Sequence, residues 1–178
     1  RSQIVATPAL WPQGAVRSSP ITGVVLTNAD VDAVAGLLHL RERQALSLWA
    51  TPYVLGILAA NPIFDVLQPE FVRRRSLEAG RPVEVDEGLW LEAFPVPGKV
   101  PLYREGNDLA DGGASIGVRI AGGFGDTFFV PSCARITPDL KERLSGANLV
   151  MFEGTFWTDD EMIDSGASPK SGRRMGHV

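Results

Sequence analysis

Cysteine, histidine and long apolar runs are scarce in this sequence. Its 178 residues include one cysteine, Cys133, and two histidines. A single cysteine cannot form an internal disulfide, which favours a reducing compartment, so we expect a cytoplasmic protein. No apolar stretch approaches the roughly 20 residues that span a bilayer, and no signal peptide opens the sequence, so we expect no membrane span.

Positive charge is sparse as well. The net charge is −4, and the longest run of basic residues is Arg73-Arg74-Arg75. Nucleic-acid binding depends on contacts between basic side chains and phosphates, so we expect no nucleic-acid partner.

The rest of the composition is that of a globular protein. Hydrophobic residues make up 44% and charged residues 21%, which is too apolar for a disordered chain. The length predicts a single domain over residues 1–178. Apolar runs predict strands at residues 23–26, 46–50, 89–94, 116–120, 127–130 and 149–152. Thr-Pro pairs at 51–52 and 137–138 and an acidic run at 159–161 predict helices between them, and hence an α/β fold.

The two ends of the sequence lack regular structure. It opens without a Met on a segment that contains Pro8 and Pro12, and it closes on "SGRRMGHV". An α/β layer that starts and stops in this way is incomplete, so we expect the chain to be the central part of a larger domain.

A group of polar side chains follows the first predicted strand. Asn28, Asp30 and Asp32 stand at every second position after it. Extended backbone places alternate residues on one side of the chain, so the three side chains can present oxygen ligands to a hard metal cation. The same residues also suit a structural role, in which Asp30 or Asp32 caps the next helix and Asn28 forms a turn. Residue patterns alone leave both interpretations open.

The same stretch resembles the metal motif of the metallo-β-lactamase superfamily. That motif is a Thr followed by His-x-His-x-Asp-His, with a Gly three residues later. Here the frame is "TNADVDAVAG", which begins at Thr27. The motif aspartate is kept as Asp32. Asn28, Asp30 and Ala33 stand where the motif has histidines.

Within this superfamily the sequence closely resembles the family of pyrroloquinoline quinone (PQQ) biosynthesis protein B. The matching segments are "LTNADVD", "GLLHLRE", "ATP" at 50–52, "FPVPGKVPLY" at 94–103, "VPSCARIT" at 130–137 and "EGTFWTDDEMIDSGASPKSGRRMGHV" at 153–178. The resemblance implies a metallo-β-lactamase-like four-layer αβ/βα sandwich, truncated at both ends. It also implies that the cysteines of the family's structural zinc site, and one active-site histidine, lie outside this chain.

The resemblance implies one of two functions. Family members resemble non-haem iron hydroxylases that use O₂ on the tyrosine of a Glu-Tyr precursor of PQQ, and mixed carboxylate and histidine ligation suits iron(II). The alternative is a soluble carrier that helps to move PQQ or its precursor to the periplasm. We favour the hydroxylase. A zinc hydrolase is not expected, because it needs several imidazoles where this chain has Asn28, Asp30, Ala33 and Ser132.

The resemblance also assigns roles to individual residues. It implies that His177 faces the active-site cleft as a catalytic residue and metal ligand, beside the candidate metal ligands Asn28, Asp30 and Asp32. Arg173 and Arg174 are candidates for binding a substrate carboxylate, although a solvated pair is equally compatible. We expect weak or absent metal in this chain, and any residual site should prefer iron(II), manganese or magnesium over zinc. Expected partners are a small peptide or PQQ precursor and other PQQ-pathway proteins, with a homodimer left open.

Three more residues have mainly structural interpretations. Glu153 begins an acidic-Gly-Thr segment like that of the family, and its structural role would be to hold a loop by accepting backbone N–H bonds. Cys133 has no nearby histidine that would support a role as nucleophile, so we expect a structural thiol. His39 lies in an amphipathic pattern of leucines, and we expect it to be structural too.

Overall fold

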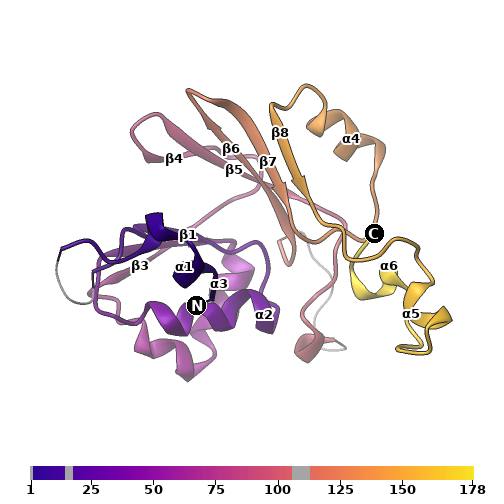
Figure 1. The fold of residues 1–178 in the computed structure, drawn as a ribbon, viewed down its shortest axis with the longest axis horizontal. Coiled ribbons are helices and arrows are strands. Elements are labelled where there is room, and N and C mark those ends of the chain that lie inside the picture. The colour runs from indigo at the N-terminus through magenta and orange to yellow at the C-terminus, as the bar shows by residue number, and fades with distance from the viewer. Residues whose placement is uncertain (1, 15–17, 106–112) are drawn as a thin grey trace. The chain divides into compact units, whose positions relative to one another are not determined.

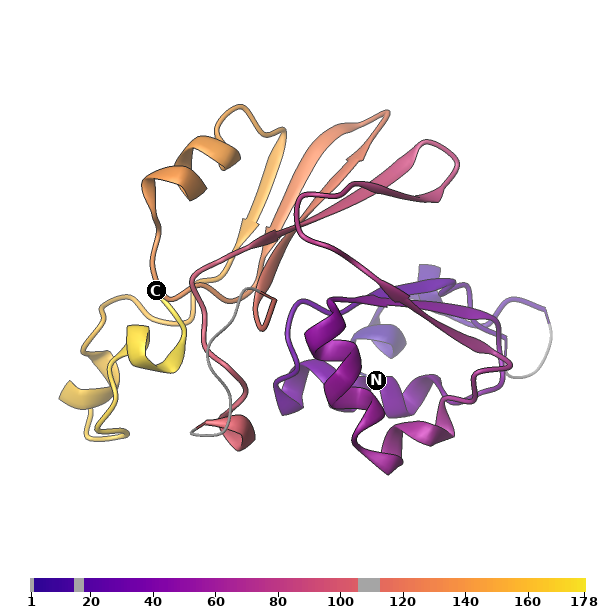
Figure 2. The same cartoon turned by 180° about the vertical axis from the view of Figure 1, so that it is seen from behind.

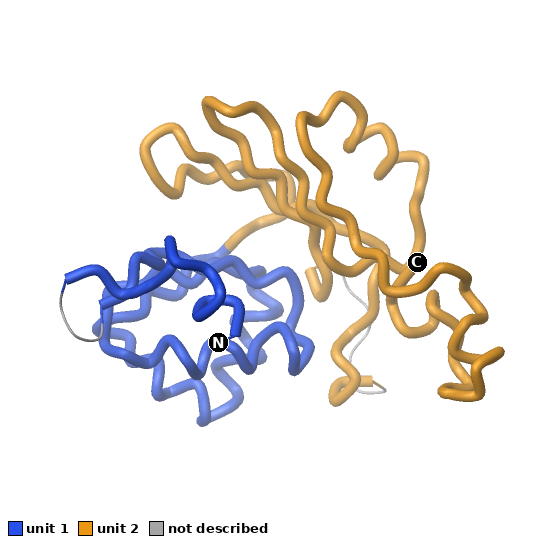
Figure 3. The backbone as a smooth tube through the Cα atoms, viewed as in Figure 1, with its two compact units in different colours: residues 1–76 blue, residues 77–178 orange. Residues whose placement is uncertain are grey.

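The computed structural model describes residues 2–14, 18–105 and 113–178 (Figure 1). It divides into two compact units, residues 1–76 and 77–178, which are coloured separately in Figure 3. The expectation of one domain over residues 1–178 stays a prediction.

The first unit is built on a parallel sheet of three strands in the order β1-β2-β3. These are β1 (Gly23–Val25), β2 (Leu46–Ala50) and β3 (Val72–Ser76). The helical segments are α1 (Ser2–Ala6), η1 (Pro8–Leu10), α2 (Val31–Val34), η2 (Ala35–Leu40), α3 (Pro52–Ala59) and η3 (Pro62–Val66). Figures 1 and 2 show α2 and α3 on the same face of this sheet. The core between sheet and helices includes the fully buried Leu48, Val54 and Leu58.

Helix α3 begins where the Thr-Pro pair predicted it. The Thr51 hydroxyl oxygen accepts a hydrogen bond from the Val54 backbone N–H at 3.3 Å, and Pro52 occupies the first helical position. Pro suits that position because its missing N–H would have no helical partner there. The Thr137-Pro138 pair starts a helix in the same way, with a bond from the Leu140 N–H at 3.2 Å.

The second unit is a sheet of five strands in the order β4-β5-β6-β7-β8. They are β4 (Val83–Asp86), β5 (Leu89–Pro95), β6 (Ile116–Gly122), β7 (Gly125–Val130) and β8 (Leu149–Phe152). Neighbours are antiparallel except β7 and β8, which run parallel because α4 (Pro138–Leu144) connects them. The other helical segments are η4 (Leu102–Arg104), α5 (Glu161–Asp164) and α6 (Gly172–Met175). A buried cluster that includes Phe94, Val130 and Leu140 joins the sheet to α4.

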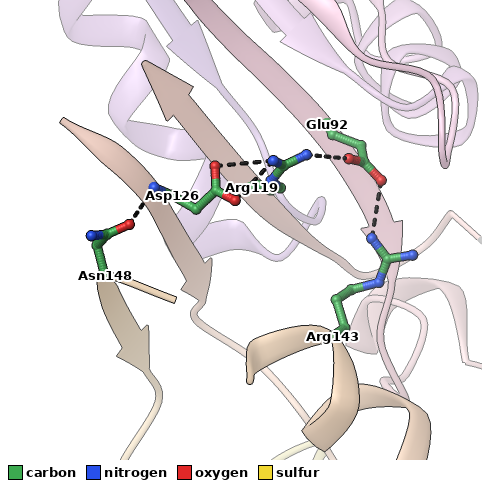
Figure 4. A network of polar contacts seen from close by, with 5 residues as sticks. All are labelled: Glu92, Arg119, Asp126, Arg143 and Asn148. Atoms are coloured by element: carbon green, nitrogen blue, oxygen red, sulfur yellow. Dashed lines mark hydrogen bonds and ion pairs between the residues drawn. The ribbon is translucent and has the colours of Figure 1, made fainter. Parts of the chain in front are cut away.

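A network of charged side chains connects β5, β6, β7 and α4 within this unit (Figure 4). Arg119 donates to both carboxylate oxygens of Asp126, at 3.0 and 2.8 Å, and to Glu92 at 3.3 Å. Arg143 from α4 donates to the other oxygen of Glu92 at 3.0 Å. Hydrogen bonding to Asp126 is the main cause that raises the pKa of Arg119. Glu92 therefore links β5 both to β6 and to the helix.

The α/β class and each strand predicted from the sequence are confirmed, whereas β3 and β4 were missed. Their sequences are "VRRRS" and "VEVD", and neither has an apolar run. In β3 the arginine guanidinium groups contact other parts of the unit: that of Arg75 lies over the Trp49 ring at 5.3 Å, and that of Arg74 donates to the Phe64 carbonyl at 3.2 Å. An edge strand tolerates such charge because one of its sides faces solvent. In the parts of the chain that the structure describes, no helix has the length and apolar character that crossing a membrane requires.

Candidate functional site

The candidate site lies at the edge of the second sheet where β7 and β8 end. Val130 pairs with Phe152, and the Glu153 N–H donates to the Val130 carbonyl at 2.8 Å. Because the two strands are parallel, their carboxyl ends meet at one edge, and the segments that follow them leave from the same place. Residues 131–137 and 153–178 therefore start side by side.

Glu153 is the centre of this site. Its Oε1 accepts hydrogen bonds from the backbone N–H groups of Cys133 at 2.9 Å and Val178 at 3.0 Å. Its Oε2 accepts from the Thr155 hydroxyl at 2.8 Å and lies 2.7 Å from Nδ1 of His177. The side chain is only 2% exposed. The loop-holding role predicted for Glu153 is confirmed, and the loop it holds includes the candidate His177.

His177 is held between this carboxylate and an aromatic ring. Its side chain is 26% exposed, and the Phe156 ring meets it edge-on at a centroid distance of 6.0 Å. The residue before it, Gly176, has a φ of 89°, a left-handed conformation that favours glycine. The Ser132 hydroxyl donates to the Gly176 carbonyl at 3.2 Å. The turn that presents His177 is thus fixed from both sides.

The two candidate substrate-binding arginines lie in α6, just before this turn. The Arg173 backbone N–H donates to the Asp159 carboxylate at 2.7 Å, which anchors the start of the helix. Both arginine side chains are exposed, and neither guanidinium forms an ion pair with another residue of the described segments. They are available to an anionic ligand, and their role in substrate binding stays a prediction.

The polar stretch after β1 belongs to the first unit and has mainly local contacts. The buried Asn28 accepts a bond on Oδ1 from the Asp30 N–H at 3.1 Å, which confirms the predicted turn. Asp30 occupies the N-cap position of α2, but its carbonyl rather than its side chain accepts the helical N–H groups, so side-chain capping by Asp30 is wrong. The exposed Asp32 accepts from the adjacent Ala33 N–H at 3.1 Å.

Metal ligation by Asn28, Asp30, Asp32 and His177 stays a prediction. Across residues 2–14, 18–105 and 113–178, no three His, Cys, Asp or Glu side chains gather as a ready metal site. The first three candidates belong to one compact unit and His177 to the other.

Sequence reasoning underestimated Thr155 and Phe156. Both touch the His177 ring, and both stand in the segment "EGTF" directly after β8. A buried strand followed at once by an acid, a hydroxyl and an aromatic residue was the available signal. His39 is exposed in η2, whereas Leu37 of the same segment is buried.

Cys133 is completely buried beside this site. Its Sγ contacts the Arg135 carbonyl at 3.2 Å, and burial raises the pKa of the thiol. A raised pKa keeps the sulfur protonated and unreactive at neutral pH, which agrees with the structural role expected for it.

We predict that Cys133 resists thiol reagents in the native protein. At pH 7.5 labelling should proceed only as fast as the protein opens, and it should become fast in denaturant. Because the folded pKa lies above the ordinary value of 9.0, stability conferred by this thiol is present below that pH and is lost as pH rises further. Stopped-flow mixing with an aromatic disulfide measures the rate at which Cys133 is labelled. Rapid stoichiometric labelling without denaturant would contradict burial.

The chain belongs to the family described as the beta-lactamase superfamily domain, which matches residues 1–178. Among individual proteins, it is 49% identical over 182 residues to Coenzyme PQQ synthesis protein B of Xanthomonas campestris pv. campestris (strain B100). It is 48% identical over 188 residues to the protein of that name from Gluconacetobacter diazotrophicus. Both comparisons include all of this chain, which spans 60% and 61% of the length of these relatives.

A solved structure agrees with these relatives. Zn²⁺-bound PqqB from Methylobacterium extorquens superposes with a TM-score of 0.93 at 43% identity, over 99% of this chain and 60% of the other. The resemblance to the PQQ biosynthesis protein B family is therefore confirmed, and so is the metallo-β-lactamase-like fold.

Proposed function

We propose that this chain forms part of a protein of PQQ biosynthesis that hydroxylates the tyrosine of a Glu-Tyr precursor with iron(II) and O₂. The relatives named above support the pathway. The observation that carries the proposal is the Glu153–His177 pair, whose polar atoms lie 2.7 Å apart, together with the two exposed arginines that precede His177 by a few residues in the chain. A partly exposed imidazole held by a buried carboxylate suits metal ligation or proton transfer.

The available donors fit iron(II) in chemical type. The candidates Asn28, Asp30, Asp32 and His177 offer an amide oxygen, two carboxylates and one imidazole, a set with more oxygen than zinc favours. The related PqqB from M. extorquens is Zn²⁺-bound, which supports metal binding by this fold, and the choice of iron rests on the donor types. Iron(II), when bound, supplies the activation of O₂.

The residues of the chain have separate tasks in this proposal. Arg173 and Arg174 bind carboxylates of the precursor, because a guanidinium matches a carboxylate with two parallel hydrogen bonds. Phe156 packs against the His177 ring and limits its rotation. His177 serves either as a metal ligand or as the group that receives and returns a proton, since a neutral imidazole offers one lone pair. The small peptide precursor, other PQQ-pathway proteins and a cytoplasmic location are part of the same proposal.

The proposal is tested by aerobic incubation of the iron-loaded protein with a Glu-Tyr dipeptide and a two-electron reductant. A product heavier by one oxygen atom, absent without iron, is the expected result. The variant Glu161→Gln should form the same product, since Glu161 is an exposed carboxylate outside the Glu153–His177 pair. Tight binding of PQQ with no turnover would overturn the hydroxylase and favour the carrier.

We predict that Asp32→Asn and Asp30→Asn each weaken iron(II) binding more than about tenfold, because neutral amides are poorer ligands for a hard cation. Thermal stability should hardly change. The Asp30 side chain does not cap α2, and an Asn side chain at position 32 can accept the Ala33 N–H bond as Asp32 does. Isothermal titration of the apoprotein with iron(II) under anaerobic conditions measures the affinity. Asp65→Asn, an exposed carboxylate of η3, is the control. Unchanged affinity in both variants would show that the stretch after β1 holds no metal.

A further inference from the structure

The two oxygens of the Glu153 carboxylate have different kinds of partner. Oε1 accepts from two backbone N–H groups, those of Cys133 and Val178, and a backbone N–H can only donate. Oε2 faces the Thr155 hydroxyl and Nδ1 of His177, at 2.8 and 2.7 Å. These two groups can each donate or accept, so the atom at the Oε2 position decides which they do.

We propose that Glu153 is a positioning residue that fixes His177 in its Nδ1–H tautomer. A carboxylate oxygen offers only lone pairs, so an Nδ1 at 2.7 Å must carry the proton and donate it. The lone pair of the neutral ring is then on Nε2. No other described residue hydrogen-bonds to Nε2, and the side chain is partly exposed. Nε2 is therefore the nitrogen presented to a ligand.

This tautomer is the one that a metal ligand or a proton acceptor at Nε2 requires. Histidines that bind metal commonly donate their other N–H to a carboxylate, which orients the ring and raises its basicity. The use of Nε2 for a ligand or a proton rests on the proposed function of His177, whereas the tautomer rests only on the contact with Glu153. An experiment can therefore disprove one without the other.

The variant Glu153→Gln separates tautomer control from simple packing. Its amide has almost the same shape, but one oxygen and one NH₂ group replace two acceptors. The two backbone N–H groups require the oxygen at the Oε1 position, because an NH₂ group there would oppose two donors. The NH₂ group must then face Nδ1, which has to accept. The His177 proton should consequently move to Nε2.

The experiment is two-dimensional ¹H–¹⁵N NMR of ¹⁵N-histidine-labelled protein, at a pH above about 8, where an ordinary imidazole is neutral. This chain has two histidines, and His39→Gln identifies the signals of the exposed one. The wild type should show His177 protonated on Nδ1. In Glu153→Gln the two ring nitrogens should exchange their chemical shifts, while those of His39 stay unchanged.

Thr155→Val provides the matched control. It removes a hydroxyl 3.2 Å from Nδ1 but leaves the Glu153 contact, so His177 should keep its Nδ1–H form. A wild type with the proton on Nε2 overturns the proposal, even if Glu153→Gln does not fold. A folded Glu153→Gln variant with an unchanged tautomer overturns it as well. An Nδ1–H tautomer together with no hydroxylation would count against the proposed function alone.

Discussion

Gly117→Ala is expected to destabilise the second unit by about 1–3 kcal/mol, the usual range for overpacking a core. Gly117 pairs with Phe94 across β5 and β6, and an added Cβ would overlap the Phe94 ring. The ring cannot easily move away. It is 1% exposed, Phe128 meets it edge-on at 5.9 Å, and the Arg143 guanidinium lies 5.0 Å from its centroid.

Urea denaturation followed by tryptophan fluorescence measures this effect as a lower transition midpoint. Gly123→Ala is the matched control, because a Cβ at Gly123 meets no atom within 4 Å and its φ is not positive. That variant should unfold at the wild-type midpoint. Equal midpoints for Gly117→Ala and Gly123→Ala would show that the core yields to a methyl group at no cost.

Glu153→Ala is expected to cost about 3 kcal/mol, since removing one partner of buried polar groups leaves the others without compensation. The truncation strips hydrogen bonds from the buried Cys133 N–H and from the Val178 N–H. It also removes the acceptor of Thr155 and His177. The segment that carries His177 should then loosen together with the loss of stability.

Chemical denaturation and proteolysis of the segment after β8 measure the two effects. Glu161→Ala is a suitable reference, because this exposed carboxylate accepts a single backbone bond, from the Trp157 N–H at 2.8 Å. Its loss should cost about 1 kcal/mol or less, as for a helix cap. If Glu153→Ala were no worse than Glu161→Ala, Glu153 would not be the anchor of this site.

Features determined by neighbouring residues were predictable from the sequence. The Thr-Pro pairs start their helices, and Asn28 forms its turn with a residue only two positions away. Strand β3 was missed because its arginines make their contacts through their guanidinium groups, which a search for apolar runs does not detect.

The candidate site was only partly predictable, because long-range pairing assembles it. Glu153 reaches Cys133 and His177 across 20 and 24 positions of sequence. Those contacts depend on the parallel alignment of β7 and β8, which no local motif encodes. The resemblance identified His177 as a candidate, but only the structure shows the oxygen to which its ring is bonded.

The parallel alignment of β7 and β8 also has an evolutionary consequence. The strands keep their register through apolar side chains and backbone pairing, whereas the polar groups of the site stand on the segments after the strand ends. Substitutions in those segments can exchange one ligand or acid for another while the sheet stays intact. The stretch after β1 has the same arrangement, with Asn28, Asp30 and Ala33 at histidine positions of the superfamily motif just after a strand that is paired in the sheet. A scaffold of this kind lets chemistry diverge faster than architecture.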